Sequence, residues 1–280
     1  MILDHKAIRF NNKPVFEKMV MKPNFKRMPK HFAENEACFL FLTNGSFQFR
    51  TPTNVLTYSK NEAMLAKCGN YFFENVLVKE YTDDDNIALI SAYFYPEMVK
   101  GFFEKDLSIK HFQNKFDVIK VNVEPLMKSF IDSVDFLLEN QSIADENIIL
   151  NKVKELLLIL SKSENASSVY DFVESLFVPH EYNFKEVVQQ NIFAEISIED
   201  LARLCNCGIT TFKRKFNEHY NETPAKYILL KKLEKATQLL HIKNKPIADI
   251  AYECGFENIP SFNKAFKKHF GKSPSEYKLD

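Results

Sequence analysis

Residues 247–271, IADIAYECGFENIPSFNKAFKKHFG, indicate two short helices joined by a tight turn. In the first half, Ile247, Ile250 and Cys254 follow the i, i+3, i+7 spacing of one helical face. Gly255 is placed to end this helix, because glycine readily takes the positive φ that lets the chain satisfy the last carbonyl groups. The first half is therefore predicted to be a helix that stops at the turn.

The second half of the stretch opens with helix-start signals. Asn258 is a good N-cap, and Pro260 falls in the first turn, where a missing N–H costs little. Phe262, Phe266 and Phe270 are spaced by four residues and form a stripe to be buried, while the opposite side is polar and cationic. This pattern predicts a helix-turn-helix whose second helix presents cationic groups outward.

The same pattern occurs about fifty residues earlier in the chain. Four apolar positions recur at an offset of 49 before the turn, and aromatic, cationic and proline positions recur at an offset of 50 after it. Self-similarity at a fixed spacing indicates a repeated structural unit. The matched pairs are Ile198 with Ile247, Leu201 with Ile250, Ala202 with Ala251, Cys205 with Cys254, Phe212 with Phe262, Arg214 with Lys264, Phe216 with Phe266, Tyr220 with Phe270, Pro224 with Pro274 and Tyr227 with Tyr277.

Residues 251–278 follow the pattern Ala-x3-Gly-Phe-x-Asn-x2-Ser-Phe-x-Lys-x-Phe-Lys-x3-Gly-x-Ser-Pro-x2-Tyr-Lys. This pattern closely resembles the C-terminal signature of AraC/XylS-type transcription regulators, and the resemblance covers about residues 183–280. One departure concerns Ile259 and Pro260, because these positions often carry base-reading polar side chains in that family. They leave apolar contact, such as contact with thymine methyl groups, as the option for this chain.

The resemblance implies a sequence-specific DNA-binding transcription regulator, an activator, with RNA polymerase as a partner. It also implies a cupin-like β-barrel in the N-terminal half, through which a small molecule or a regulatory protein controls activity. Helices that follow the barrel commonly carry dimerisation in this family, so a homodimer through residues 124–160 is expected. From the residues alone, packing of these helices within one subunit is an equal alternative.

Position within the motif assigns the side chains that would meet double-stranded DNA. Arg214 suits a bidentate contact with guanine, and Asn263 suits adenine. The second helix of each helix-turn-helix is here called its reading helix. The helix expected over 224–240 is about 25 Å long, so it would hold the two reading helices roughly one DNA turn, ~34 Å, apart. Expected base readers are Thr210, Thr211, Lys213, Arg214, Ile259, Pro260, Asn263 and Lys264, and expected phosphate contacts are Lys215, Lys267, Lys268 and Lys272.

Overall charge argues against a chain that is basic everywhere, because 37 basic and 37 acidic residues give a net charge of zero. Residues 180–280 hold 16 Lys and Arg against 13 Asp and Glu, so nonspecific polyanion binding should be modest. No apolar run reaches the roughly 18 residues that span a bilayer, and the start lacks the apolar core of a signal peptide. Five cysteines without framework spacing fit a reducing compartment, and a cytoplasmic protein is expected.

The N-terminal half is predicted to be rich in β-strands. Asn44–Gly45 separates the strand-like runs 38–43 and 46–50, which predicts a hairpin. The first run is nearly all apolar, as in a strand covered on both faces, and the second alternates apolar with polar residues. Further strand candidates lie at 55–58, 63–67, 71–73, 87–94 and 118–123, which suggests a small barrel or sandwich.

Aromatic residues in these strands are candidates for an effector pocket, although plain core packing is the more common role of such residues. A cupin metal site would need clustered His and carboxylate ligands, whereas His5, His31 and His111 are scattered along the chain. Neither a metal nor any other cofactor is therefore expected. The pocket candidates are Phe39, Phe41, Phe47, Phe49, Tyr71, Phe72 and Phe73.

The predicted fold class is α+β. Residues 1–165 are expected to form an effector-binding and dimerisation domain, with the barrel at 1–123 and helices at 124–165, one of which places Leu126, Phe130 and Val134 on one face. A linker is expected at 166–182, followed by an all-α DNA-binding domain at 183–280.

Two other function classes are open. A cupin-type enzyme with a DNA-binding tail would need ligand clusters, a nucleophile with its base or a Gly-rich phosphate loop, and the chain has only 6 glycines. An alkyl-transfer DNA repair protein would need a reactive cysteine in a basic pocket, whereas Cys38 and Cys68 have no adjacent His or Arg. The sequence thus favours a regulator without enzymatic activity.

Overall fold

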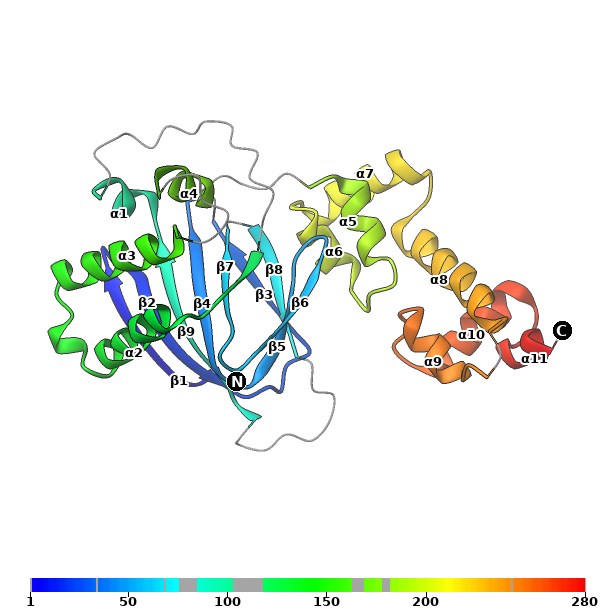
Figure 1. The fold of residues 1–280 in the computed structure, drawn as a ribbon. Helices are drawn as coiled ribbons and strands as arrows, with labels where there is room; N and C mark the ends of the chain where they lie inside the picture. Colours follow the sequence, from blue (N-terminus) through cyan, green and yellow to red (C-terminus); the bar gives the residue numbers. More distant parts are fainter. Residues whose placement is uncertain are drawn as a thin grey trace. The chain divides into compact units, whose positions relative to one another are not determined.

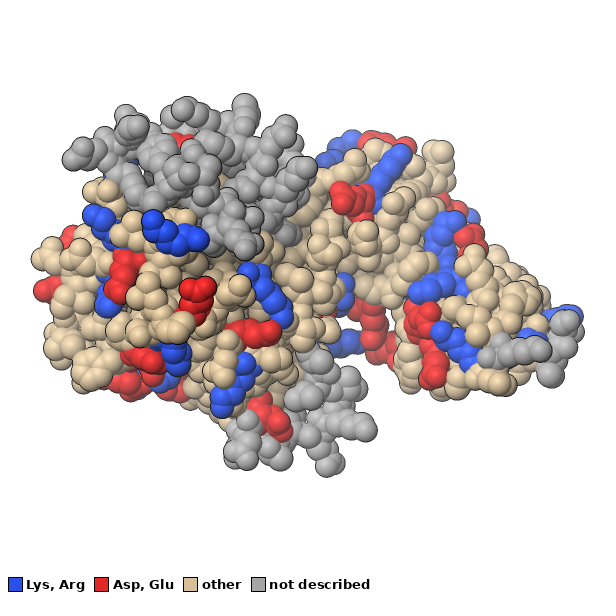
Figure 2. Space-filling view, in the orientation of Figure 1, with Lys and Arg blue, Asp and Glu red and all other residues tan. Residues whose placement is uncertain are grey.

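The chain forms two compact units in a computed structural model, Met1–Glu181 and Tyr182–Asp280 (Figure 1). The structure describes residues 2–33, 35–67, 69–75, 85–102, 118–162, 169–177, 182–242 and 244–279. Basic and acidic side chains are mixed over both units on the face drawn in Figure 2, as expected for a chain with 37 of each kind. Within the described helices, none is both long and apolar enough to cross a bilayer.

The N-terminal unit is built from two antiparallel sheets. The six-stranded sheet has the order β1-β2-β9-β4-β7-β10, and the four-stranded sheet has the order β3-β8-β5-β6. The α+β prediction, with a β-rich N-terminal half and an all-α C-terminal half, is confirmed. The strands are β1 Ile2–Phe10, β2 Lys13–Met21, β3 Arg27–Phe32, β4 Ala37–Asn44, β5 Ser46–Arg50, β6 Val55–Ser59, β7 Ala63–Ala66, β8 Gly69–Glu74, β9 Ile87–Phe94 and β10 Val118–Val121.

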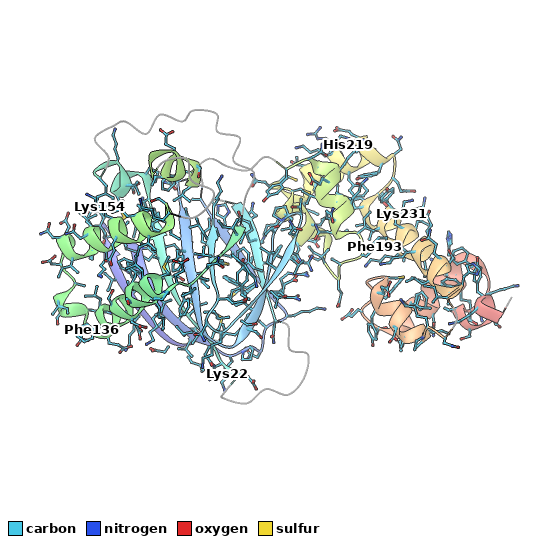
Figure 3. All side chains as sticks on the ribbon, viewed as in Figure 1. Lys22, Phe136, Lys154, Phe193, His219 and Lys231 are labelled. Carbon is cyan, nitrogen blue, oxygen red and sulfur yellow. The ribbon has the colours of Figure 1, made fainter. Side chains whose placement is uncertain are left out.

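One hydrophobic core joins buried side chains of both sheets and of the helices, and Figure 3 shows side chains filling the unit. β4 is buried on both faces over its first six residues, as its apolar sequence predicts. On β5, Phe47 and Phe49 are buried and alternate with half-buried polar residues. The continuous burial of β4 fits its place in the middle of the larger sheet. The alternating burial of β5 fits a strand with one covered face.

The hairpin predicted at Asn44–Gly45 is wrong. β4 pairs with β7 and β9, whereas β5 pairs with β6 and β8, so the chain passes from one sheet to the other at this turn. Gly45 has φ +80°, and a Cβ added to it would lie 2.9 Å from the backbone oxygen of Asn86. The turn is tight, as the sequence indicates, but β4 already has a partner on each side and cannot also pair with β5.

The described helices of this unit come after β9 in the chain, with α1 before β10 and the others after it. α2 and α3 pack on each other, and α2 also packs on β1 and β2. On α2, Phe130 and Val134 are buried as predicted, but Leu126 is 63% exposed and Met127 is buried in its place. The bounds are α1 Pro96–Lys100, α2 Pro125–Glu139, the 3-10 turn η2 Gln141–Ile143, α3 Glu146–Leu160 and α4 Val169–Leu176, the last within the range predicted as a linker.

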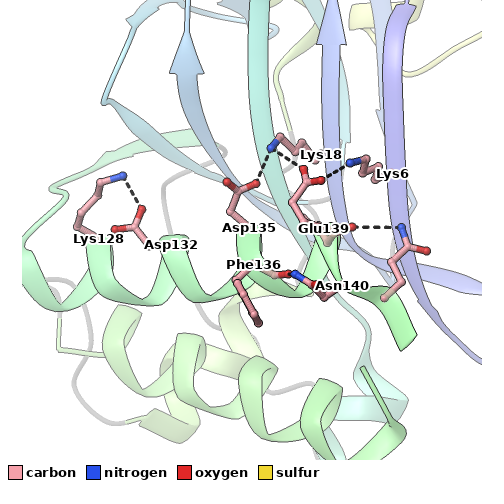
Figure 4. A network of polar contacts seen from close by, with 10 residues as sticks. Lys6, Lys18, Lys128, Asp132, Asp135, Phe136, Glu139 and Asn140 are labelled. Carbon is pink, nitrogen blue, oxygen red and sulfur yellow. Dashed lines mark hydrogen bonds and ion pairs between the residues drawn. The ribbon is translucent and has the colours of Figure 1, made fainter. Parts of the chain in front are cut away.

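Ion pairs attach the C-terminal end of α2 to the larger sheet (Figure 4). Lys18 of β2 lies 2.7 Å from Asp135 and 2.9 Å from Glu139, and Lys6 of β1 also pairs with Glu139. Hydrogen bonds from Lys6 and Lys18 hold the pKa of Glu139 down at about 2. The charged carboxylate of Glu139 is therefore favoured in the folded protein relative to the unfolded chain.

Replacement of Glu139 by Gln should lower the urea midpoint of unfolding at pH 7. Because the folded pKa lies below the ordinary value of 4.5, the stabilisation is present above that pH and is lost as the pH falls towards about 2. The difference in urea midpoint between wild type and Glu139→Gln should therefore become smaller as the pH is lowered. Asp132→Asn is the control, since it removes a pair with Lys128 inside the same helix. If the urea midpoint of Glu139→Gln were below that of wild type by the same amount at every pH, the charged carboxylate of Glu139 would not be the source of the stabilisation.

Seven helices make up the described part of the C-terminal unit. Two helix-turn-helix modules, α6–α7 and α9–α10, are joined by α8, and α5 and α11 flank them. The all-α prediction for this half is confirmed. The bounds are α5 Phe184–Asn191, α6 Ile198–Leu204, α7 Ile209–Tyr220, α8 Pro224–Leu240, α9 Ile247–Glu253, α10 Ile259–Phe270 and α11 Pro274–Leu279.

Candidate nucleic-acid interface

The two modules have the same aromatic packing at equivalent positions. The ring centroids of Phe212 and Phe216 on α7 are 5.6 Å apart, and those of Phe262 and Phe266 on α10 are also 5.6 Å apart. A tyrosine from the following helix then closes each stripe edge-on. Tyr227 lies 5.5 Å from Phe216 at an interplanar angle of 73°, and Tyr277 lies 5.4 Å from Phe266 at 81°. The sequence repeat is therefore a repeat of packing, and each module includes the start of the helix after it.

The turns and helix ends of the modules also correspond. In the first module the left-handed positions are Asn206 at φ 51° and Asn221 at φ 52°, and in the second they are Gly255 at φ 77° and Gly271 at φ 76°. Asparagine and glycine are the residues that most readily adopt this conformation. Both modules thus end their helices in the same way, with a different residue type.

α8 belongs to the cores of both modules. It is a helix of 17 residues, which corresponds to about 25 Å of length. Its first turn supplies Tyr227 to the first aromatic stripe. Its second half is buried in the other module, through Leu233, Ala236 and Leu240. Because both ends of this helix are packed, it can act as the strut that the sequence predicts.

The outer faces of α7 and α10 carry the predicted DNA contacts. Thr211 and Ile259 are half-buried, and the other predicted side chains are exposed. On α7, Arg214 donates to Glu218 at 2.8 Å, and both side chains of this pair are more than half exposed. An exposed pair of this kind contributes little to stability, so Arg214 can exchange Glu218 for a stronger acceptor. The exposed set is Thr210, Lys213, Arg214, Lys215, Pro260, Asn263, Lys264, Lys267, Lys268 and Lys272.

The N-termini of the reading helices differ in how they are capped. The side chain of Asn258 accepts a hydrogen bond from the amide of Ser261 at 2.9 Å, as the sequence predicts for the start of α10. Pro260 lies in the first turn of the same helix. Gly208 occupies the N-cap of α7 and makes no side-chain cap. The start of α10 is therefore held by its own cap, whereas that of α7 depends on packing.

Comparisons with known proteins agree with this architecture. A helix-turn-helix domain model matches residues 201–279, and the ExsA N-terminal regulatory domain model matches residues 37–172. The virulence regulon transcriptional activator VirF of Yersinia enterocolitica is 27% identical over 158 residues, and the regulator ExsA of Pseudomonas aeruginosa is 28% identical over 124 residues. The chain belongs to the AraC family of transcription regulators.

These matches are partial in length. The VirF match covers 56% of this chain and 58% of VirF, and the ExsA match covers 44% and 45%. This AraC-family chain therefore spans about half the length of the curated relatives it matches. The crystal structure of unsaturated fatty acid bound ToxT from Vibrio cholerae is 17% identical and covers 97% of both chains, at a TM-score of 0.38 that supports no further inference.

In the N-terminal unit of this AraC-family chain, the predicted pocket residues are buried and mostly pack on one another. The ring of Phe73 lies 4.9 Å from Phe47 and 5.0 Å from Phe49, and Tyr71 lies 5.1 Å from Phe49. Phe39 and Phe41 are each 1% exposed, and Phe72 is fully buried. A role of these residues in effector binding stays a prediction.

The described cysteines do not have the character of a repair nucleophile. Burial raises the pKa of Cys38 to about 12 and that of Cys205 to about 12, so both are protonated at neutral pH. A reactive cysteine would need a lowered pKa. Cys68 lies outside the described residues. Within the described part of the chain, His, Cys, Asp and Glu form no cluster of three or more that could hold a metal ion.

Sequence reasoning missed the internal role of several lysines of the AraC-type domain. Lys232 and Lys235 of α8 donate to the backbone oxygens of Gly255 and Glu253, and Lys278 donates to that of Lys245. These lysines are therefore tied to the second module instead of being displayed on a reading helix. A lysine at a helix C-terminus is a recognised signal for carbonyl capping, but here the lysines come from neighbouring helices, which sequence spacing does not reveal.

Loss of the Asn258 cap should destabilise the second module. Asn258→Ala removes the hydrogen bond to the Ser261 amide, and we expect a loss of about 1 kcal/mol in the free energy of urea unfolding, followed by circular dichroism. Asn258→Asp is the matched control, because its carboxylate can accept the same hydrogen bond. If Asn258→Ala and Asn258→Asp were equally stable, the cap would have no measurable role.

Proposed function

We propose that this chain is a sequence-specific regulator of transcription that binds double-stranded promoter DNA and acts as an activator in the cytoplasm, without enzymatic activity. The observation that carries the proposal is the pair of equivalent modules that share α8 and expose their reading helices. A recognition helix of this type enters the major groove, whose base pairs present distinguishable donor and acceptor patterns. One chain would then contact two successive major grooves.

Exposure and chemistry support a division of roles between the cationic side chains. Arg214 extends from α7 with a planar fork of donors, which matches the two acceptors of guanine. Lys267 and Lys268 lie in the last turn of α10, away from the helix N-terminus that would face the bases. We assign base reading to Thr210, Thr211, Lys213, Arg214, Ile259, Pro260, Asn263 and Lys264, and phosphate contact to Lys215, Lys267, Lys268 and Lys272.

The N-terminal unit would control this activity by binding a small molecule or a regulatory protein. Support comes from the match of residues 37–172 to a domain described as regulatory, and from relatives that are named as transcriptional activators. An activator also needs a contact with the transcription machinery, so RNA polymerase is the further partner that we propose. The buried rings of Phe47, Phe49, Tyr71 and Phe73, which pack on one another, mark the place where an apolar effector would bind.

We also propose that the chain forms a homodimer through residues 124–160. An apolar groove of about 400 Å³ lies along α2 and α3, where Leu126 is 63% exposed and Leu158 is 40% exposed. Lys154 and Glu155 line the same groove, so a second copy related by twofold symmetry could offer opposite charges to it. Exposed apolar patches on helices commonly mark interaction surfaces.

Base reading and phosphate contact predict different binding defects. DNA selected from a random pool by the full-length protein would be compared with unselected DNA at several salt concentrations. Arg214→Ala should weaken binding to selected DNA by about 1–3 kcal/mol and leave unselected DNA nearly unaffected. Lys267→Ala should weaken both and reduce the slope of log K against log salt by about 0.9.

Glu218→Ala is the control for Arg214→Ala, because it removes the partner of Arg214 without removing the donor. Binding of Glu218→Ala to selected DNA should be at least as tight as that of wild type. Equal weakening of all sequences by Arg214→Ala would refute its role as a base reader. A wild-type protein that enriched no sequence from the pool would refute the proposed function itself.

The dimer proposal predicts that wild type and a variant of the groove differ in the mass at which they sediment. Wild type should sediment as a dimer at micromolar concentration, and the double variant Leu126→Glu/Leu158→Glu should sediment as a monomer, because two carboxylates would have to be buried in the groove. Val55→Glu is the control, since Val55 is 40% exposed and lies on β6, outside residues 124–160. A monomeric wild type, or a double variant that stayed dimeric, would exclude this surface.

A further inference from the structure

The two helix-turn-helix modules touch each other directly as well as through α8. Gly255, in the turn of the second module, faces the loop between α5 and α6 of the first. A Cβ added to Gly255 would lie 2.2 Å from the carbonyl oxygen of Phe193 and 2.8 Å from its carbonyl carbon. No side chain fits at that distance, so the contact requires glycine.

Comparison of the repeats shows that this glycine is not needed for the turn alone. Asn206 occupies the equivalent position of the first module, has φ 51°, and is exposed. An asparagine can therefore make the same left-handed turn. At Gly255 the carbonyl of Phe193, in the loop before the first module, lies too close for a side chain.

Two lysines of α8 hold the same contact in place. Lys232 donates to the backbone oxygen of Gly255 at 2.6 Å, and Lys235 donates to that of Glu253 at 2.9 Å. The ammonium group of Lys235 also lies 4.3 Å from the ring centroid of Phe193. These two cations meet the negative C-terminal end of α9, where carbonyl groups lack helical partners. The first module, α8 and the second module are therefore connected at one point.

We propose that this contact, made by Phe193, Lys232, Lys235 and Gly255, fixes the orientation of the second module relative to the first and so selects DNA by the spacing between its two groove contacts. The inference rests on the proposed function, in which α7 and α10 read successive grooves. Burial of α8 in the core of the second module holds that module on the helix, and the contact with Phe193 adds an attachment to the loop before the first module. None of the four residues lies on α7 or α10, so they would act by positioning.

The energetic reason is the effective concentration of the second module. Once one reading helix is bound, the other binds as an intramolecular event, whose strength depends on how well the connection matches the span. A second module held at one orientation relative to the first binds strongly to DNA with one spacing and poorly to the others. A second module whose orientation varies binds the best spacing less strongly and tolerates neighbouring spacings better.

The test uses full-length protein and DNA selected from a random pool, with the two contacted segments located by footprinting. Probes carry an insertion or deletion of one base pair between these segments. Lys232→Met/Lys235→Met keeps the apolar stems and removes both hydrogen bonds. The spacing penalty is the loss of affinity that one inserted or deleted base pair causes. The variant should bind DNA of the selected spacing on the order of tenfold more weakly than wild type, and its spacing penalty should be smaller.

Lys231→Met/Lys226→Met is the matched control, because it also removes two charges from α8. Lys231 and Lys226 pair with Glu234 and Glu222, and those pairs do not involve the second module. The control should show the wild-type spacing penalty. A second test exchanges the residues of the two turns, where Gly255→Asn should relax spacing as Lys232→Met/Lys235→Met does and Asn206→Gly should not. Circular dichroism would verify that the variants are folded.

The outcomes separate the two proposals. If wild type selects DNA and its spacing penalty is the same in wild type and in the Lys232→Met/Lys235→Met variant, the positioning role is wrong and the proposed function stands. If wild type selects no DNA, the proposed function fails before the spacing is measured. A reduced spacing penalty in Lys232→Met/Lys235→Met, with the control unchanged, supports the inference.

Discussion

The burial of α8 in two hydrophobic cores is the constraint on which the C-terminal unit depends. A helix-turn-helix module of two short helices has too little apolar area to form a stable core alone. Tyr227, in the first turn of α8, closes the stripe of the first module, and Leu233 and Leu240 enter the core of the second. Neither module can therefore be completed without the helix that connects it to the other, and the distance between the reading helices follows from that shared packing.

The sequence predicts much of this unit because its signals are local. Phenylalanines spaced by four, the cap at Asn258 and the glycine at 255 all act within a few residues, and the structure has each of them as expected. The pairing of the strands is harder to predict from sequence. A run such as 46–50 shows that one face is covered, but it does not show which strand is its neighbour, and the Asn44–Gly45 turn was therefore misread as a hairpin. Pairing between distant strands depends on contacts that a local pattern does not contain.

Long-range contacts also explain which site residues the sequence did not reveal. The exposed cations of α7 and α10 follow from their place in the motif, whereas Lys232 and Lys235 look like ordinary surface lysines of a helix. Their acceptors lie 18 or more residues away in the chain, at the end of α9. Burial lowers the pKa of Lys232, whereas a solvated lysine on an outer face would keep its ordinary pKa. Only the fold brings these groups together.

The repeat is most informative where its two copies differ. At the offset of 50, Ile209, Thr210 and Thr211 at the start of α7 correspond to Ile259, Pro260 and Ser261 at the start of α10, so the second helix has one polar side chain fewer in its first turn. In its last turn that helix has Lys267 and Lys268, which favour phosphate, where α7 has Asn217 and Glu218. If both helices enter DNA, the second would make more phosphate contacts than the first. Phosphate contacts fix the position of a protein on DNA and carry no sequence information directly, and this is why the attachment at Gly255 would matter to recognition.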